Sequence, residues 1–262
     1  MSSSADSLAL QGWTAVVRDP KVLLSGKPYI NKPSPLLVKD IPFPSDDTLV
    51  VKVQEYARDK LTPQTYNHSM RVFYFGESRP AHASQVQVSD PSEASAILDQ
   101  QFPELARSLS RPTLALTALL HDIGTTHENL RSTHLSFEFY GGILALDLVG
   151  NQLGAPRSQA EAVAEAIFRH QDLGTTGKIT FLGQLIQLAT IYDNIGGNPD
   201  LVSPETKADV VDAFPRNGWN QCFAATIREE NGLKPWAHTT ALGEEEFPDG
   251  VLHNELMAEF DD

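Results

Sequence analysis

The feature that most restricts the fold of this chain is a helix-length segment that is apolar almost all round. Residues 114–120 read Leu-Ala-Leu-Thr-Ala-Leu-Leu and run directly into His121 and Asp122. A surface helix keeps one polar face, so a helix without one must be enclosed by other elements. The segment predicts a domain built around a buried helix that ends in two titratable residues.

Further helical segments flank this one in the sequence. From Ser45 onward, apolar residues recur at helical spacing, with capping residues or Pro at helix starts and Gly at several helix ends. The expected helices cover about 45–57, 63–76, 112–124, 132–150, 156–171, 181–195, 205–214 and 220–230. Residues 80–103 read as a loop with a short helix from Glu93. The pattern predicts an all-α fold of seven or eight helices with negligible sheet.

Composition divides the 262 residues into three parts. Residues 1–44 form an irregular, Pro-rich lead-in, in which 14–17 can make at most a small strand. Residues 45–232 form the helical domain, and 233–262 form an acidic C-terminal tail. Within the tail, 243–262 has no Lys or Arg, which favours a solvated or loosely docked segment. Its acidic residues are Glu244, Glu245, Glu246, Asp249, Glu255, Glu259, Asp261 and Asp262.

The charge balance excludes several classes of partner. A formal net charge of −14 gives no general attraction for nucleic acid or an anionic membrane, so we expect neither as a partner. No signal peptide or run of about 18 apolar residues is present, so we expect a cytoplasmic protein. Cys222 is the only cysteine, which rules out an intrachain disulfide and a thiolate zinc cluster. We expect a small-molecule substrate and a homo-oligomeric assembly.

Polar residues interrupt the apolar faces of four expected helices. His68 lies in line with Val72 and Phe75, and His170 continues the face of Ile167. The doublet His121-Asp122 ends the central helix, and Asp193 shares a face with Thr190 and Ala189. Any one of these residues has an ordinary explanation, such as a hydrogen-bonded core histidine or a helix cap. Together, three His and two Asp on inward faces indicate a metal site for Zn, Fe or Mn.

The doublet has a geometric requirement of its own. Adjacent helical residues project about 100° apart, so His121 and Asp122 reach one ion only where the helix ends, and Ile123-Gly124 supplies that end. With His68 upstream and Asp193 downstream, the four residues resemble the H…HD…D signature of the HD-domain superfamily. That resemblance implies an all-helical HD-domain bundle in which His68, His121, Asp122 and Asp193 bind metal. A three-ligand site without Asp193 would also suit a hydrolytic zinc.

Longer motifs resemble the fungal cyanamide hydratase branch of that superfamily. They are Asn67 to Arg71, His121 to Thr126, Ser136 to Gly142, Arg169 to Asp172 and Gly183 to Asn194. The resemblance spans about residues 45–225 and implies a Zn²⁺ enzyme that adds water to cyanamide, a small neutral nitrile, and yields urea. By position, His170 and Thr190 become active-site residues. We expect His170 to carry the proton and Thr190 to orient substrate or water.

Three alternatives stay open. An HD-type metal phosphohydrolase acting on a nucleotide or other phosphate ester is disfavoured because Thr125-Thr126 stands where many such enzymes carry a basic residue. A two-iron oxygenase would use His127 and His134 as extra ligands. A binding module would hold metal without turnover. We expect His82, His238 and His253 to lie in exposed segments, and Cys222 to be a small core residue.

Overall fold

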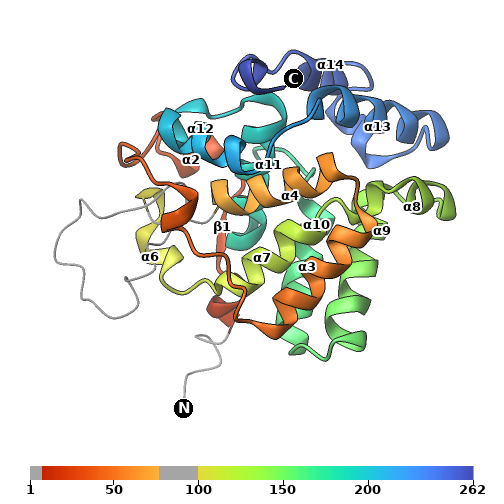
Figure 1. The fold of residues 1–262 in the computed structure, drawn as a ribbon, viewed down its shortest axis with the longest axis horizontal. Helices are drawn as coiled ribbons and strands as arrows, with labels where there is room; N and C mark the ends of the chain where they lie inside the picture. Colours follow the sequence, from red (N-terminus) through yellow and green to blue (C-terminus); the bar gives the residue numbers. More distant parts are fainter. Residues whose placement is uncertain (1–7, 77–99, 262) are drawn as a thin grey trace.

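Helix α7 (Arg111–Leu120) lies in the interior of the molecule, as the sequence predicts. The computed structural model describes residues 8–76 and 100–261, and residues 113–120 of α7 are buried throughout. Around α7 pack α3 (Thr48–Lys60), α4 (Pro63–Gly76), α10 (Arg157–Arg169) and α11 (Phe181–Ile195) (Figure 1). The predicted all-α fold is confirmed.

Side-chain caps fix where the central helices begin. The Asp47 carboxylate accepts hydrogen bonds from the N–H groups of Leu49 and Val50 at 2.9 and 3.1 Å, so α3 starts later than the Ser45 boundary we expected. Ser110 caps α7 and Thr180 caps α11 in the same way. Helix α11 ends where Gly196 adopts a φ of +68°, a left-handed conformation that favours glycine.

The segment after α7 is divided differently from the prediction. A 3₁₀ turn, η3 (Ile123–Thr125), leads into the short helix α8 (His127–Ser132). Helix α9 (Phe137–Leu146) then continues into the π-helical segment η4 (Asp147–Gln152). The expected helix start at Ser132 or Thr133 is therefore wrong, because Ser132 ends α8. At Gly124 a side chain would overlap the Phe137 carbonyl, so this glycine lets α9 approach the turn after α7.

The N-terminal part forms one small sheet and short helices. Strand β1 (Ala15–Val17) pairs antiparallel with β2 (Lys178–Thr180), with Ala15 opposite Thr180. The small strand expected at 14–17 is confirmed, and its partner just before α11 was not anticipated. Three short elements complete this part: α2 (Pro20–Leu23), η1 (Val38–Asp40) and α6 (Pro103–Ala106). The helix expected from Glu93 lies outside the described residues.

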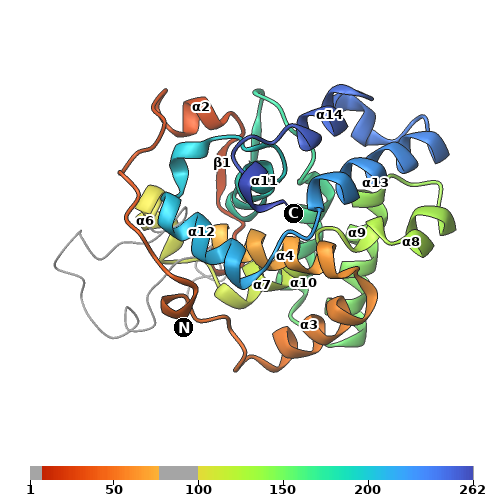
Figure 2. The same ribbon diagram turned by 45° about the horizontal axis from the view of Figure 1, so that its top comes forward.

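The acidic C-terminal segment is folded onto the domain. After α12 (Pro204–Ala213) and α13 (Trp219–Leu233) come η6 (His238–Leu242), α14 (Glu246–Leu252) and η7 (Ala258–Phe260) (Figure 2). Helix α14 packs on α11 and α13, and Val251 and Met257 are fully buried. Several acids form ion pairs: Arg228 with Glu245 and Asp249, Lys207 with Glu259, and Arg216 with Asp261. A solvated or loosely docked segment is therefore a wrong description of it.

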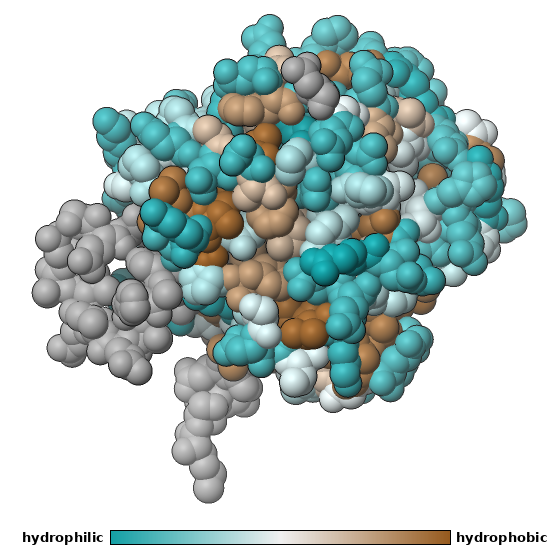
Figure 3. All heavy atoms as spheres, viewed as in Figure 1, coloured by the Kyte–Doolittle hydropathy of each residue, from teal (hydrophilic) through white to brown (hydrophobic). Residues whose placement is uncertain are grey.

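Hydrophilic side chains dominate the face in Figure 3, with smaller apolar patches between them. Among the described residues, no helix combines the length and apolar character needed to span a bilayer. The domain boundaries expected at 44/45 and 232/233 stay predictions.

Candidate metal centre

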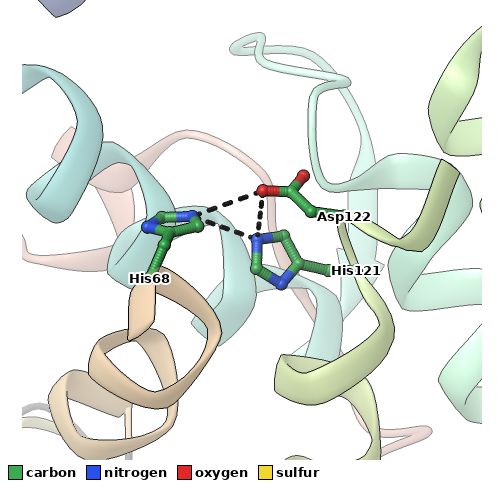
Figure 4. Close-up of side chains that lie close together, drawn as sticks. All are labelled: His68, His121 and Asp122. Carbon is green, nitrogen blue, oxygen red and sulfur yellow. Dashed lines mark hydrogen bonds and ion pairs between the residues drawn. The ribbon is translucent and has the colours of Figure 1, made fainter. Parts of the chain in front are cut away.

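Three buried side chains meet where α7 ends. His68 projects from α4, while His121 and Asp122 follow α7, and all three side chains are at most 1% exposed (Figure 4). The two Nε2 atoms of His68 and His121 lie 3.1 Å apart. Asp122 Oδ2 lies 3.6 Å from His68 Nε2 and 3.2 Å from His121 Nε2. The helix end thus brings both members of the doublet to one point, as its spacing predicts.

The outer nitrogen of each imidazole is held by an acceptor. His68 Nδ1 donates to Asp193 Oδ2 at 2.6 Å, and His121 Nδ1 donates to the Ala118 carbonyl at 2.8 Å. Because these partners only accept, each Nδ1 carries the hydrogen in the neutral ring and Nε2 keeps its lone pair. Two lone pairs and a carboxylate oxygen therefore converge on one small volume.

This convergence fits a metal ion. Asp122 Oδ2 is buried and makes no hydrogen bond, and two imidazole lone pairs facing each other repel unless a cation lies between them. Neutral imidazole and carboxylate are ligands for zinc, iron and manganese. Within residues 8–76 and 100–261, His68, His121 and Asp122 form the single cluster of His, Cys, Asp and Glu side chains close enough to share one ion.

The electrostatics of the cluster favour the ligating forms of two of its members. Burial lowers the pKa of His68 to about 4, so this ring is neutral near pH 7. Burial opposes ionisation of Asp122, but His121 and the other nearby imidazoles hold the pKa of its carboxyl well below the usual range. For His121, the Asp122 carboxylate and the Ala118 carbonyl outweigh burial and raise the pKa. A metal would therefore compete with a proton at His121 Nε2.

Asp193 lies on the far side of the His68 ring from Asp122. Its carboxylate accepts hydrogen bonds from His68 Nδ1, from Arg71 at 2.8 to 3.1 Å, and from Arg216 Nη1 at 2.8 Å. Both arginine side chains are fully buried. Arg216 also contacts Asp261 Oδ1 at 2.8 Å, so two guanidinium groups share two carboxylates. The structure thus brings Asp193 to the imidazole of His68 and not into the cluster itself.

His170 and Thr190 lie beside the cluster, facing a small cavity. His170 caps the end of α10, donates from Nδ1 to the Ile167 carbonyl at 2.8 Å, and places Nε2 3.7 Å from Asp122 Oδ1. Burial and the nearby His121 lower the pKa of His170. The Thr190 hydroxyl lies 2.8 Å from the Ile186 carbonyl oxygen and 3.1 Å from that of Gln187, so it donates its hydrogen to a carbonyl of α11. Both residues border the cavity together with His121 and Asp122.

The cavity measures about 20 Å³, slightly more than the volume that holds one water, so it has no room for a large molecule. Its polar side consists of His121, Asp122, His170, Gln171, Thr190 and Asn194. Its apolar side consists of Leu173, Ile191, Ile195, Leu242 and Phe247. Leu242 and Phe247 come from the C-terminal segment, which therefore closes one side of the site. None of these lining residues is Lys or Arg.

The remaining histidines and the cysteine lie elsewhere. His127, His134 and His253 are exposed, and none of them joins the cluster, so the structure gives no support to His127 and His134 as extra iron ligands. His238 is half-buried rather than exposed, because its Nδ1 lies 2.8 Å from Glu138 Oε1. His82 lies outside the described residues. Cys222 is half-buried and packs beside the cluster of Trp219 and Phe223.

Several residues of the site were missed by sequence reasoning. Arg71 is three residues after His68 and so shares its helix face, which is a signal that could have identified it. Arg216 lies in a turn between α12 and α13, where no periodicity exists. Trp219, whose ring stacks on His68 at 4.3 Å, begins α13 and resembles an ordinary core residue in the sequence.

Comparison with known proteins identifies close relatives. Cyanamide hydratase DDI2 and cyanamide hydratase DDI3 of Saccharomyces cerevisiae are each 42% identical to the chain over 229 residues. The matched region covers 87% of this chain and 92% of each relative. Comparison with protein-family profiles finds no match.

Proposed function

The chain belongs to the cyanamide hydratase family, and from this premise we propose that it adds water to the nitrile of cyanamide and releases urea. The cavity beside the cluster is the single observation that supports this activity most strongly. It is small, and none of the residues around it is Lys or Arg. Such a site suits a neutral substrate of a few atoms.

We infer that His68, His121 and Asp122 hold a zinc ion and that the chain is a member of the HD-domain superfamily. The arrangement of these three residues with Asp193 supports this assignment. The same ligands would accept iron or manganese. Zinc bound there supplies Lewis acidity and makes hydroxide available from water near neutral pH. Asp193 orients His68 by accepting the hydrogen of Nδ1, a supporting contact typical of histidine ligands.

His170 carries the proton in this proposal. Its Nδ1 is held by the Ile167 carbonyl, which leaves Nε2 as the working atom on the cavity side. Hydration forms a C–O bond at the nitrile carbon, converts C≡N to C=N, and requires a proton at the nitrogen that gains negative charge. His170 Nε2 takes the proton released by the attacking water and delivers it to that nitrogen. The resulting isourea becomes urea when its O–H proton moves to nitrogen.

Thr190 acts as an acceptor. Because the Thr190 hydroxyl donates its hydrogen to a carbonyl of α11, only the lone pairs of Oγ1 remain for a molecule in the cavity. The amino group of cyanamide carries N–H donors that match it. In this proposal Thr190 orients the substrate.

A phosphate ester fits this site poorly. Phosphate recognition relies on Arg, Lys or clustered backbone N–H groups, whereas the cavity lining has neither Lys nor Arg. The nearby cations Arg71 and Arg216 are both bound to Asp193. These observations favour the hydratase over the phosphohydrolase. The cytoplasmic location and homo-oligomeric state stay predictions from the sequence.

Elemental analysis of the purified protein, combined with a urea assay on cyanamide, tests the proposal. We expect about one zinc per chain and urea formation, and no phosphate release from nucleotides by the same sample. His121→Ala should remove both metal and activity, with the exposed His253→Ala as the matched control. A metal-loaded wild-type protein that forms no urea, or one that releases phosphate instead, would contradict the proposal.

A further inference from the structure

We propose that Asn194 is a catalytic residue: its side-chain amide donates a hydrogen bond to the nitrile nitrogen of the substrate as that nitrogen gains negative charge. The inference rests on the proposed hydration of cyanamide and adds a residue to it. Asn194 borders the cavity near the end of α11 and is 6% exposed.

The orientation of the Asn194 amide is set by a donor-only partner. Trp219 Nε1 lies 2.8 Å from Asn194 Oδ1. An indole N–H can only donate, so the oxygen of the amide must face Trp219 and the nitrogen must face away from it. Many asparagine side chains fit their surroundings equally well with oxygen and nitrogen exchanged, but the Trp219 donor fixes the positions of both atoms in Asn194.

The amide nitrogen is then left for the cavity. Within the part of the chain that the structure describes, Asn194 Nδ2 makes no hydrogen bond. It is also not one of the fully buried polar atoms that lack a partner, so it keeps some accessible surface. A buried amide normally satisfies its donors, so a pair of N–H groups without a protein acceptor beside a cavity indicates that a bound molecule accepts from them.

Rigid neighbours hold this donor in place. The Trp219 ring is 1% exposed and stacks on His68 at 4.3 Å and on Phe223 at 4.9 Å. One indole therefore contacts an imidazole of the metal cluster with its face and orients Asn194 with its N–H. A donor fixed before the reaction costs little reorganisation when charge develops.

The chemistry of the cavity pairs this donor with an acceptor. Asn194 follows Thr190 by four residues, so both lie on one face of α11. Thr190 Oγ1 offers lone pairs and Asn194 Nδ2 offers N–H groups. Cyanamide is complementary to this pair, since its nitrile nitrogen accepts and its amino group donates. Acetonitrile has the acceptor but no N–H donor, so we expect it to be a much poorer substrate.

Asn194→Asp is the most informative substitution. A carboxylate keeps an acceptor for Trp219 Nε1 and nearly the same shape, but it has no donor for the nitrile. We expect kcat to fall about 100-fold, the effect of removing one donor from a developing anion, with metal content and thermal midpoint close to wild type. Trp219→Phe keeps an aromatic ring on His68 but frees the Asn194 amide, and we expect kcat to fall about 10-fold. Gln159→Glu, an amide-to-acid exchange at a buried position that does not border the cavity, is the matched control.

A binding measurement gives a second readout. In protein labelled with ¹⁵N-asparagine, the side-chain NH₂ signal that is missing from Asn194→Asp should shift when excess cyanamide is added to the metal-loaded wild type. Urea formation by the wild type is measured first, so its absence would refute the proposed function rather than this inference. If the wild type is active, kcat of Asn194→Asp within twofold of wild type, or an unmoved Asn194 signal, would overturn the inference. If Asn194→Asp does not fold, Trp219→Phe and the wild-type signal decide it.

Discussion

Asp193 binds His68 through Nδ1 at 2.6 Å, on the opposite edge of the ring from the Nε2 atom that faces His121. Replacing Asp193 with Asn keeps the shape of this contact but removes its charge. We expect metal affinity to fall about 10- to 100-fold, the usual effect of losing a partner that orients a histidine ligand. We also expect a stability loss of about 3–5 kcal/mol, because Arg71 and Arg216 lose their shared counter-charge.

Chelator competition and urea-induced unfolding measure these two effects. Asp209→Asn is the control, since Asp209 accepts a hydrogen bond from the Val38 N–H and does not belong to the metal cluster. Complete loss of metal from Asp193→Asn, equal to that of His121→Ala, would instead make Asp193 a direct ligand.

His170→Ala separates metal binding from proton transfer. Because His170 Nε2 lies outside the three-residue cluster, the variant should retain its metal while kcat falls about 10²- to 10⁴-fold, the range for loss of a general acid or base. Metal analysis and urea assays are run on one preparation. A variant that emptied of metal would show that His170 is a ligand.

Phe247→Ala should broaden the substrate range. The ring borders the cavity from the C-terminal segment, so its removal enlarges the space beside Thr190 and Asn194. We expect the ratio of activity on dimethylcyanamide to activity on cyanamide to rise, with a stability loss of about 2 kcal/mol for the lost burial. Trp236→Ala, at a side chain that is 62% exposed, is the control. An unchanged ratio would show that Phe247 does not limit substrate size.

The pair of His238 and Glu138 should make stability depend on pH. The hydrogen bond to Glu138 raises the pKa of His238 above its usual value. Because the folded-state pKa is raised, protonated His238 stabilises the protein. This contribution is complete at pH values below the unfolded-state pKa of about 6.5, and it disappears as the pH rises through the folded-state pKa. The unfolding free energy of wild type minus that of His238→Gln should therefore shrink between pH 6 and pH 9. A difference that stayed constant, or grew, would contradict the assignment; His253→Gln serves as control.

Asp261 should contribute more to stability than its position in an acidic segment suggests. Its side chain is 13% exposed and pairs with the fully buried Arg216. We expect Asp261→Asn to cost about 1–3 kcal/mol in unfolding free energy. Glu259→Gln breaks an exposed pair with Lys207 and should cost about 0–1 kcal/mol. Equal losses in the two variants would show that burial of the pair has no effect.

Helical spacing predicted which polar side chains point into the interior. It predicted that His68, His170, Thr190 and the His121-Asp122 doublet point into the interior, because each continues the apolar part of its helix. It also placed Asp193 on the correct face of α11. Spacing cannot distinguish the two nitrogens of an imidazole, however, and Asp193 reaches Nδ1 of His68 from the outer side.

Other parts of the site depend on contacts between distant segments. Arg216 and Trp219 lie at a turn and a helix start, so periodicity carries no information about them. The acidic segment was misjudged because a charge count does not reveal its partners. Arg228, Lys207 and Arg216 on or near the preceding helices neutralise several of its carboxylates, and its buried residues Val251 and Met257 are too widely spaced to suggest a helix.

The contacts of the C-terminal segment with Asp193 also constrain the order of events during synthesis. Asn254 donates to the Asp193 backbone carbonyl from 61 residues away, and Asp261 balances Arg216. A growing chain emerges from the ribosome N-terminus first, so His68, His121 and Asp122 are present well before these supports. A nascent chain that has just completed α11 holds every residue of the cluster together with Asp193, but it lacks Arg216, Asn254 and Asp261, which hold Asp193 in place. Metal captured at that stage would be held loosely, and tight retention would begin only once residues 254–261 have emerged.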